Sequence, residues 1–175
     1  MGEVRRGSQA AFETIFERYR EPVWRFFRRR TPDAGVAQEL AQDTFVVLLE
    51  GARRYEKRGM FRSYVFGVAY NVLMADRRKR AYRTAEPLEV EPPSAHRTDH
   101  DAVIWIRQAM ASLDENDREI LMLREYEELS YQEIADVRGI PMNTVRSQLF
   151  RARMALRAAL DARTAEPVRT SHAGH

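Results

Sequence analysis

The sequence predicts an all-α protein made of two small helical domains that a flexible linker joins. Apolar residues recur at intervals of three and four over most of the chain, and no segment alternates in the way that a strand requires. An acidic, Pro-containing stretch at 81–101 interrupts this periodicity. The predicted units are therefore an N-terminal bundle at 8–80 and a C-terminal bundle at 102–162, followed by a disordered tail at 163–175.

Three helices are expected in the N-terminal unit. Ser8 is a suitable N-cap for the first helix, which carries an apolar face until Pro22 interrupts it. Asp33 is a candidate cap for the second helix, and the third is expected from Phe61 to Arg80. The apolar residues expected on the packing faces of these helices are Phe12, Ile15, Phe16, Tyr19, Val23, Phe26, Phe27, Val36, Leu40, Val47, Leu48, Val65, Val68, Val72 and Leu73.

The C-terminal unit has the pattern of several short helices and a longer final one. Ser130 opens one of them with Glu133 three residues later, which is the arrangement of a capping box. Gly139 is expected to end that helix, and Pro141 to begin the last one. Earlier in the unit, helices are marked by a cap at Asp114 and by the apolar residues Val103, Ile106, Ala109, Met110, Leu113, Ile120, Leu121 and Leu123.

The segment from Ser130 to about Leu156 has the pattern of a helix-turn-helix. Two helices that cross steeply around a tight turn need a small residue at their contact, a turn residue that tolerates positive φ, and a branched apolar residue on the second helix. Ala135, Gly139 and Val145 meet these needs in that order. An ordinary helical hairpin is the alternative. The outward side of the second helix favours contacts with bases in the major groove, because it carries Arg146, Ser147, Phe150, Arg151 and Arg153.

The charged residues are distributed in three blocks. Residues 1–80 hold 17 Lys and Arg against 10 Asp and Glu, residues 81–129 hold 5 against 12, and residues 130–175 hold 7 against 4. The local net charges are +7, −7 and +3. This arrangement suits a protein that contacts a polyanion at two places and is held away from it, or held by something else, between them.

Composition argues against several classes of protein. The sequence contains no cysteine, which excludes disulfides and thiolate metal sites and fits a cytoplasmic protein. No apolar run approaches the roughly 18 residues that span a bilayer, so no membrane insertion is expected. His96 and His100 have a metal-like spacing but lie in the predicted linker, and no phosphate loop or acid pair indicates catalysis. We therefore expect no enzymatic activity, no catalytic residue, no metal and no cofactor.

Two parts of the chain resemble the extracytoplasmic-function (ECF) sigma factors of bacterial RNA polymerase, which belong to the sigma-70 family. The segment LDENDREILMLREYEELSYQEIADVRGIPMNTVRSQLFRARMALRAAL resembles their DNA-binding fourth region. In the N-terminal unit, AQELAQDTFVVLLE and FRSYVFGVAYNVLMADRRKR resemble the core-binding helix and the −10 helix of their second region. The resemblance implies a sigma factor that binds core polymerase, recognises −10 and −35 promoter elements, and helps to melt the −10 element.

The resemblance also implies roles for individual positions. The residues matching those that face the −35 element are Thr144, Arg146, Ser147, Phe150 and Arg151. Those matching the −10 loop and helix are Lys57, Arg58, Met60, Phe61, Asn71, Arg77, Arg78 and Arg80, although Phe61 suits the core equally well. Those matching the surface for the polymerase β′ clamp helices are Glu39, Gln42, Asp43 and Phe45. The implied partners are core polymerase, including its β flap, promoter DNA, and an anti-sigma factor.

A helix-turn-helix regulator that works without polymerase is the alternative function. It predicts a ligand pocket or a self-complementary interface, and the sequence shows neither. It also leaves Asn71 beside a basic run unexplained. Transcription with core polymerase distinguishes the two hypotheses.

Overall fold

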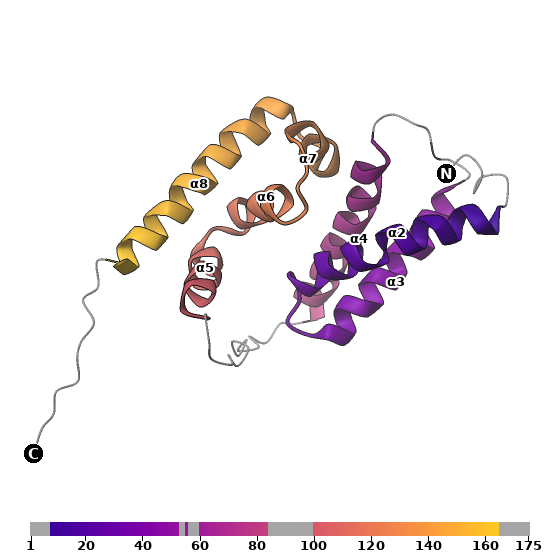
Figure 1. Ribbon diagram of the computed structural model, residues 1–175, viewed down its shortest axis with the longest axis horizontal. Coiled ribbons are helices and arrows are strands. Elements are labelled where there is room, and N and C mark those ends of the chain that lie inside the picture. The colour runs from indigo at the N-terminus through magenta and orange to yellow at the C-terminus, as the bar shows by residue number, and fades with distance from the viewer. Residues whose placement is uncertain (1–7, 53–54, 56–59, 84–99, 165–175) are drawn as a thin grey trace, which may run out of the picture.

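The computed structural model describes residues 8–52, 55, 60–83 and 100–164, and these residues form α-helices and no strand, which confirms the predicted fold class. The helices are α2 (Gln9–Arg28), α3 (Ala34–Gly51), α4 (Phe61–Arg83), α5 (His100–Ser112), α6 (Glu115–Glu125), α7 (Tyr131–Arg138) and α8 (Met142–Thr164). Figure 1 shows them in two groups, α2 to α4 and α5 to α8. Within the described ranges, none of the helices combines the length and the apolar character that crossing a bilayer requires.

The first three helices form the N-terminal unit, and local capping fixes two of their starts. The Ser8 hydroxyl accepts a hydrogen bond from the Ala11 amide at 3.3 Å. The Asp33 carboxylate accepts from the amides of Gly35 and Val36 at 2.6 and 3.2 Å. Both predicted N-caps are confirmed. The buried apolar residues of these three helices are Tyr19, Val23, Phe26, Phe27, Ala37, Leu40, Ala41, Phe45, Leu48, Val65, Phe66, Ala69 and Leu73.

Helix α2 continues through Pro22, where the sequence predicts an interruption. A proline removes one backbone hydrogen bond and disfavours a helix interior by about 3 kcal/mol. The residues that follow it offset this cost, because Val23, Phe26 and Phe27 are all fully buried on the continued helix. Burying each such side chain contributes about 1.5–3 kcal/mol. The expected break was therefore wrong, because tertiary burial outweighs the local preference.

Helix α3 turns a slightly different face to the core from the one expected. Leu40, Thr44 and Leu48 recur every four residues and are buried, whereas Val47 is 42% exposed. The Thr44 hydroxyl donates to the Leu40 carbonyl at 2.8 Å, so this buried polar group is satisfied within the helix. The prediction that Val47 is buried was wrong, because it lies about 100° around the helix from Leu48 and outside the buried stripe.

In the C-terminal unit, capping residues mark where the short helices begin and end. Asp114 caps α6 by accepting a hydrogen bond from the Asn116 amide at 2.9 Å, as predicted. The Ser130 hydroxyl accepts from the Glu133 amide at 3.2 Å, and the Glu133 carboxylate accepts from the Ser130 amide at 2.9 Å. The predicted capping box is thus confirmed. Gly139 ends α7 with a φ of 63°, a left-handed conformation that a side chain would strain.

The helix ends differ from the predicted bounds by a few residues. Helix α4 runs to Arg83, α5 begins at His100, and α8 runs on to Thr164. What remains of the predicted linker and tail, at 84–99 and 165–175, lies outside the described residues. The buried apolar residues of the C-terminal unit are Ala109, Leu113, Ile120, Leu121, Met122, Leu123, Leu129, Ile134, Ala135, Val137, Val145, Leu149 and Ala152.

The two units pack directly against each other, with α4 beside α7 (Figure 1). A methyl group added at Gly67 of α4 would lie 4.0 Å from the Cα of Val137 in α7. The Arg30 side chain, just beyond α2, forms ion pairs with Glu119 and Glu127 of the C-terminal unit. The sequence separates the two units correctly but contains no pattern that indicates this contact between them.

Candidate nucleic-acid and polymerase interfaces

Helix α8 has one face in the core and the opposite face in solvent. Val145, Leu149 and Ala152 are buried at intervals of four and three residues, and they attach the helix to α6 and α7. The opposite side is exposed in this part of the helix, and Phe150 on it is 67% exposed. Of the residues expected to face the −35 element, four are exposed and Thr144 is half-buried, and we call this set the α8 face: Thr144, Arg146, Ser147, Phe150 and Arg151.

Asn143, in the first turn of α8, is exposed on the same side of the helix as the α8 face, and the sequence prediction missed it. Its side-chain oxygen accepts a hydrogen bond from an Arg146 Nη at 3.3 Å, so the two polar groups hold each other in place. Asn143 precedes Ser147 by four residues and Phe150 by seven, which places all three on one side of the helix. The signal that could have identified Asn143 is its helical spacing from the residues that were predicted. An exposed Asn can form two hydrogen bonds with adenine in the major groove.

Arg153 belongs to a structural contact rather than to the α8 face. Its guanidinium donates to a Glu125 carboxylate oxygen at 3.0 Å and to the Tyr131 hydroxyl at 3.4 Å. The hydrogen bond that Arg153 donates to Glu125 raises the pKa of Arg153 above its ordinary value, and the one that it donates to Tyr131 adds to the effect. The expectation that Arg153 points outward with the other arginines was therefore incomplete, because α6 and the start of α7 supply partners for it.

Replacing Ser130 with Ala is expected to lower the free energy of unfolding by about 0.5–2 kcal/mol. The change removes the hydroxyl that accepts from the Glu133 amide, at the start of the first helix of the helix-turn-helix. Urea unfolding followed by circular dichroism measures the effect. Thr14→Ala is the control, because the Thr14 hydroxyl is exposed and donates to the Ala10 carbonyl of its own helix, so its loss should change stability little. An equal effect of both changes would contradict the role of the cap.

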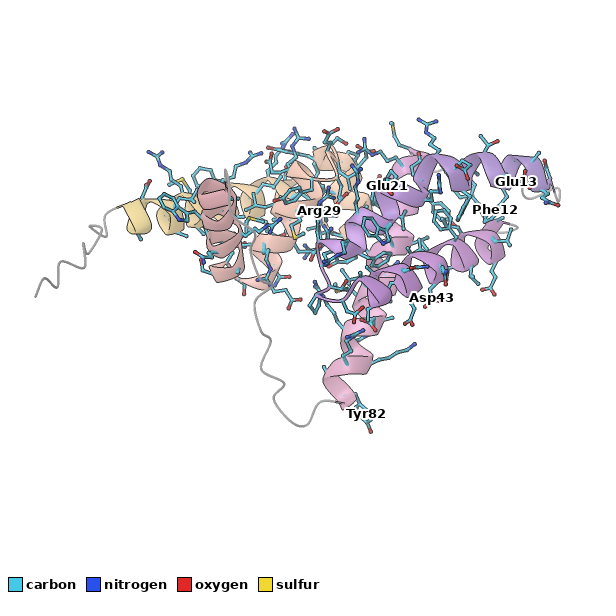
Figure 2. All side chains as sticks on the ribbon, turned by 60° about the horizontal axis from the view of Figure 1, so that its bottom comes forward. Phe12, Glu13, Glu21, Arg29, Asp43 and Tyr82 are labelled. Atoms are coloured by element: carbon cyan, nitrogen blue, oxygen red, sulfur yellow. The ribbon has the colours of Figure 1, made fainter. Side chains whose placement is uncertain are left out.

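Helix α4 divides the predicted −10 residues between two environments. Asn71 and Arg78 are exposed and lie seven residues apart, so they share one face of the helix. Arg77 points elsewhere, because its guanidinium pairs with Glu115 at 2.6 Å. Arg80 pairs with Asp76 one turn earlier at 2.7 Å. Figure 2 shows that this end of α4, marked by Tyr82, projects beyond the rest of the molecule.

The predicted −10 loop is only partly described. Lys57 and Arg58 lie outside the described residues, and Met60 at the start of α4 is largely exposed. Phe61 is half-buried in a group of aromatic rings, with centroid distances of 5.6 Å to Tyr19 and 6.0 Å to Tyr55. The structure therefore gives the Phe61 ring a packing role, which was one of the two roles the sequence allowed.

Helix α3 presents a mixed acidic and apolar surface. The predicted core-binding residues Glu39, Gln42 and Asp43 are exposed, and Figure 2 shows Asp43 on this helix. Phe45 is only 5% exposed and makes an edge contact with the Phe16 ring at a centroid distance of 4.9 Å. Its ring faces the α2–α3 contact, so it shapes the helix rather than its outer surface. Beside the acids, three apolar residues that were not among the predicted core-binding residues are exposed: Val46, Val47 and Leu49.

Comparison with known proteins shows that each of the two units matches a protein family. Residues 15–83 match sigma-70 region 2, and residues 104–156 match sigma-70 region 4. The chain is 30% identical over 173 residues to the RNA polymerase sigma-H factor of Pseudomonas aeruginosa, with 90% of each chain covered. It is 31% identical over 159 residues to the ECF RNA polymerase sigma factor SigC of Mycobacterium tuberculosis, with 87% of this chain and 85% of that one covered.

Two solved structures have a similar fold. CnrH, determined in complex with the cytosolic domain of CnrY, matches with a TM-score of 0.70 at 24% identity over 91% of this chain and 94% of its own. The sigma factor RpoE of Bartonella quintana, determined in complex with the anti-sigma factor NepR, matches with a TM-score of 0.72 at 20% identity over 86% and 97%. By its sequence relatives and by the families that its two units match, this chain belongs to the ECF group of the sigma-70 family of RNA polymerase sigma factors.

Proposed function

We propose that this sigma factor binds core RNA polymerase through α3, reads a −35 element with α8, and reads and helps to melt a −10 element with α4 and the loop before it. The observation that carries the proposal is the presence of two separate exposed polar and basic helix faces, one in each unit, in a chain whose relatives are RNA polymerase sigma factors. Two such faces suit a promoter that presents two elements. A regulator that works without polymerase needs neither the region 2 unit nor the surface of α3.

Reading of the −35 element rests on the side chains of the α8 face. Arg146 and Arg151 have the donors for paired hydrogen bonds to guanine, and Asn143 suits adenine. Phe150 places an exposed ring where it can contact a thymine methyl group. Thr144 and Ser147 are placed to contact phosphate or sugar. Because Val145 and Leu149 are buried behind this face, the helix presents these groups on a rigid support.

Recognition of the −10 element combines base contacts with phosphate contacts. Asn71 is the base-reading residue on α4, and Arg78 on the same face holds the backbone. A base that leaves the stack needs an apolar surface and nearby cations to repay an unstacking cost of a few kcal/mol. Met60 offers exposed apolar surface, with Phe61 beside it. The remaining residues assigned to this element by family resemblance are Lys57, Arg58, Arg77 and Arg80.

Binding to polymerase is assigned to the outer face of α3. Glu39, Gln42 and Asp43 give this face acidic and polar groups that suit a basic partner helix. The exposed Val46 and Leu49 add apolar area that a folded chain usually covers or uses for binding. We assign this face to the β′ clamp helices and the region 4 unit to the β flap. Phe45 supports the face from beneath.

The remaining features of the proposal follow from family membership. The protein acts by binding, without catalytic residues, metal or cofactor, in the cytoplasm where polymerase and DNA meet. An anti-sigma factor is included among its partners, because RpoE, which shares its fold, was determined with the anti-sigma factor NepR. The experiment that tests the function is transcription from a promoter selected from random DNA with the reconstituted holoenzyme. Tight DNA binding by the chain alone, with no transcript when core polymerase is added, would favour the polymerase-independent regulator.

Replacing Arg151 with Ala is expected to weaken promoter binding by holoenzyme by about 1–3 kcal/mol and to relax the sequence preference at one position of the −35 element. Arg151 is exposed on α8, and its nearest acidic partner, Asp117, lies 3.9 Å away. This loose pair leaves the guanidinium free to contact a base. Competition binding against a set of single-base promoter variants measures both effects. Arg153→Ala is the control, because Arg153 is engaged by Glu125, and a uniform loss on every DNA sequence would contradict base reading by Arg151.

A further inference from the structure

An acidic side chain of another helix lies beside an arginine of the α8 face. Asp117 is in the first turn of α6, and its Oδ1 lies 3.9 Å from Nη2 of Arg151. The Asp117 side chain is 19% exposed, whereas the Arg151 side chain is 67% exposed. The carboxylate is therefore the inner member of the pair, and the guanidinium is the outer one.

Hydrogen bonds fix the turn that carries Asp117. The Asp114 carboxylate accepts from the Asn116 amide at 2.9 Å, and the Asp114 carbonyl accepts from the Arg118 amide at 2.8 Å. The Asn116 side-chain oxygen accepts from Nη2 of Arg138 at 3.2 Å, which connects this turn to the end of α7. Helix α6 also packs on α8. The Asp117 carboxylate is thus presented by a rigid support that the helix-turn-helix shares.

The distance between the two charges determines what the pair can do. A separation of 3.9 Å exceeds the 2.7–3.2 Å of a typical hydrogen bond, so the Asp117 carboxylate leaves the N–H donors of Arg151 available. Opposite charges this close still attract each other, so the carboxylate favours the positions of the guanidinium that lie near it. A negative charge is also favourable at Asp117 itself, because the first turn of a helix stabilises anions. Arg151 is therefore oriented and keeps its donors for DNA.

The carboxylate also affects which part of the DNA Arg151 binds. A free arginine binds phosphate oxygens readily, and such contacts carry no sequence information. A phosphate that binds Arg151 brings its negative charge close to Asp117, and like charges in contact repel each other. The guanine acceptors O6 and N7 carry no net charge, so they avoid this repulsion. A carboxylate at this place therefore favours contact with a base over contact with a phosphate.

We propose that Asp117 is a positioning residue that directs Arg151 to a base edge of the −35 element and away from the neighbouring phosphates. The inference rests on the proposed function, because it takes the α8 face as the surface that reads this element. It assigns the specificity of one promoter position to two residues from different helices. Arg146 differs from Arg151 here, because its hydrogen-bond partner on α8 is the neutral side chain of Asn143.

Asp117→Asn tests the proposal in the reconstituted holoenzyme. The probes are duplex promoter fragments that carry each of the four bases at the position whose preference Arg151→Ala relaxes. Asp117→Asn should lower the preference for the favoured base at this position by at least about twofold, the low end of the coupling between residues in contact. Fragments with the other three bases should bind as tightly as before or more tightly, because a charge that repels phosphates is lost. The preference at the other −35 positions should not change.

The salt dependence of binding is a readout that a purely structural role of Asp117 does not move. In Asp117→Asn, Arg151 becomes able to bind a phosphate when the favoured base is absent. On those fragments the slope of log affinity against log salt concentration should steepen by about 0.9, the value for one additional phosphate contact. Adding Asp117→Asn to Arg151→Ala should change neither the base preference nor the slope, because the side chain that Asp117 directs is already missing.

Two further variants separate the role of the carboxylate from folding and from net charge. Asp117→Glu keeps a carboxylate in the first turn of α6 and should keep the base preference. Asp136→Asn removes one negative charge from α7, where the Asp136 carboxylate accepts from the Gln132 side chain at 3.0 Å. It should leave the preference at the Arg151 position unchanged. Thermal unfolding followed by circular dichroism checks that every variant is folded at the temperature of the binding assay.

The outcomes distinguish this inference from the proposed function. If Arg151→Ala relaxes the base preference and Asp117→Asn does not, the role of Asp117 is overturned and the proposed function is unaffected. An equal loss of preference in Asp136→Asn, or in Asp117→Glu, would also overturn it. A preference that Arg151→Ala itself leaves intact would contradict both the role of Asp117 and the reading of the −35 element by Arg151.

Discussion

Replacing Phe26 with Ala is expected to lower the free energy of unfolding by about 3–5 kcal/mol. Phe26 is fully buried on α2, and its ring lies 5.1 Å from that of Phe27 and 5.9 Å from that of Phe66, measured between centroids. The Arg30 guanidinium packs on the same ring. The variant therefore leaves a cavity where α2 meets α4 and removes the support of the buried cation. Urea unfolding at constant protein concentration measures the loss.

Arg25→Ala is the matched control for this variant, because Arg25 precedes Phe26 on α2 and is exposed. Its pair with Glu21 lies on the surface, where such pairs contribute about 0–1 kcal/mol. A Phe26→Ala loss no larger than that of the control would contradict the packing seen at α2. Binding of core polymerase should fall in Phe26→Ala, since the N-terminal unit carries the surface assigned to it.

Replacing Leu149 with Ala is expected to lower stability by about 2–5 kcal/mol and to weaken recognition of the −35 element as a consequence. Leu149 is fully buried on α8, between Val145 and Ala152 in the stripe that attaches the helix to α6 and α7. Without it the α8 face loses its rigid support. Thermal unfolding measures the stability, and binding to a promoter fragment by holoenzyme measures the recognition.

The neighbouring residue separates the two effects. Phe150→Ala removes a side chain that is exposed on the α8 face, so it should change stability by only a few tenths of a kcal/mol while still weakening promoter binding. The two substitutions thus affect opposite sides of one helix. If Phe150→Ala lowered stability as much as Leu149→Ala, the assignment of inner and outer faces of α8 would be wrong.

Local features of the fold were predictable because they depend on residues close in sequence. The caps at Ser8, Asp33 and Asp114 and the box at Ser130 were confirmed, since each is formed by a side chain and a backbone amide within three residues. Gly139 was identified by the same logic, because only a turn residue with positive φ fits there. The continuation of α2 through proline was not predictable, because it depends on burial against other helices.

The candidate sites were predictable to the extent that helical spacing determines a face. Spacing places Arg146 and Phe150 on the outer side of α8, and it also places Asn143 there, which the prediction left out. Helical spacing does not reveal whether an arginine predicted to be exposed forms an ion pair with another helix. Arg77 and Arg153 resemble the DNA-facing arginines in sequence, yet acids from other helices occupy both.

The sequence by itself determined the helical class, the division into two units, the helix-turn-helix and the family, because periodicity, caps and motif spacing are local properties. Only the tertiary structure decided how the two units meet. Arg30 lies 89 residues from Glu119 and 97 from Glu127, and no periodic pattern connects residues so far apart. The contact between α4 and α7 likewise depends on how the two units pack in three dimensions. For this reason the charge blocks of the sequence left open whether the acidic middle is kept away from a polyanion or held by something else, whereas the structure shows arginines of the N-terminal unit paired with two of its acids.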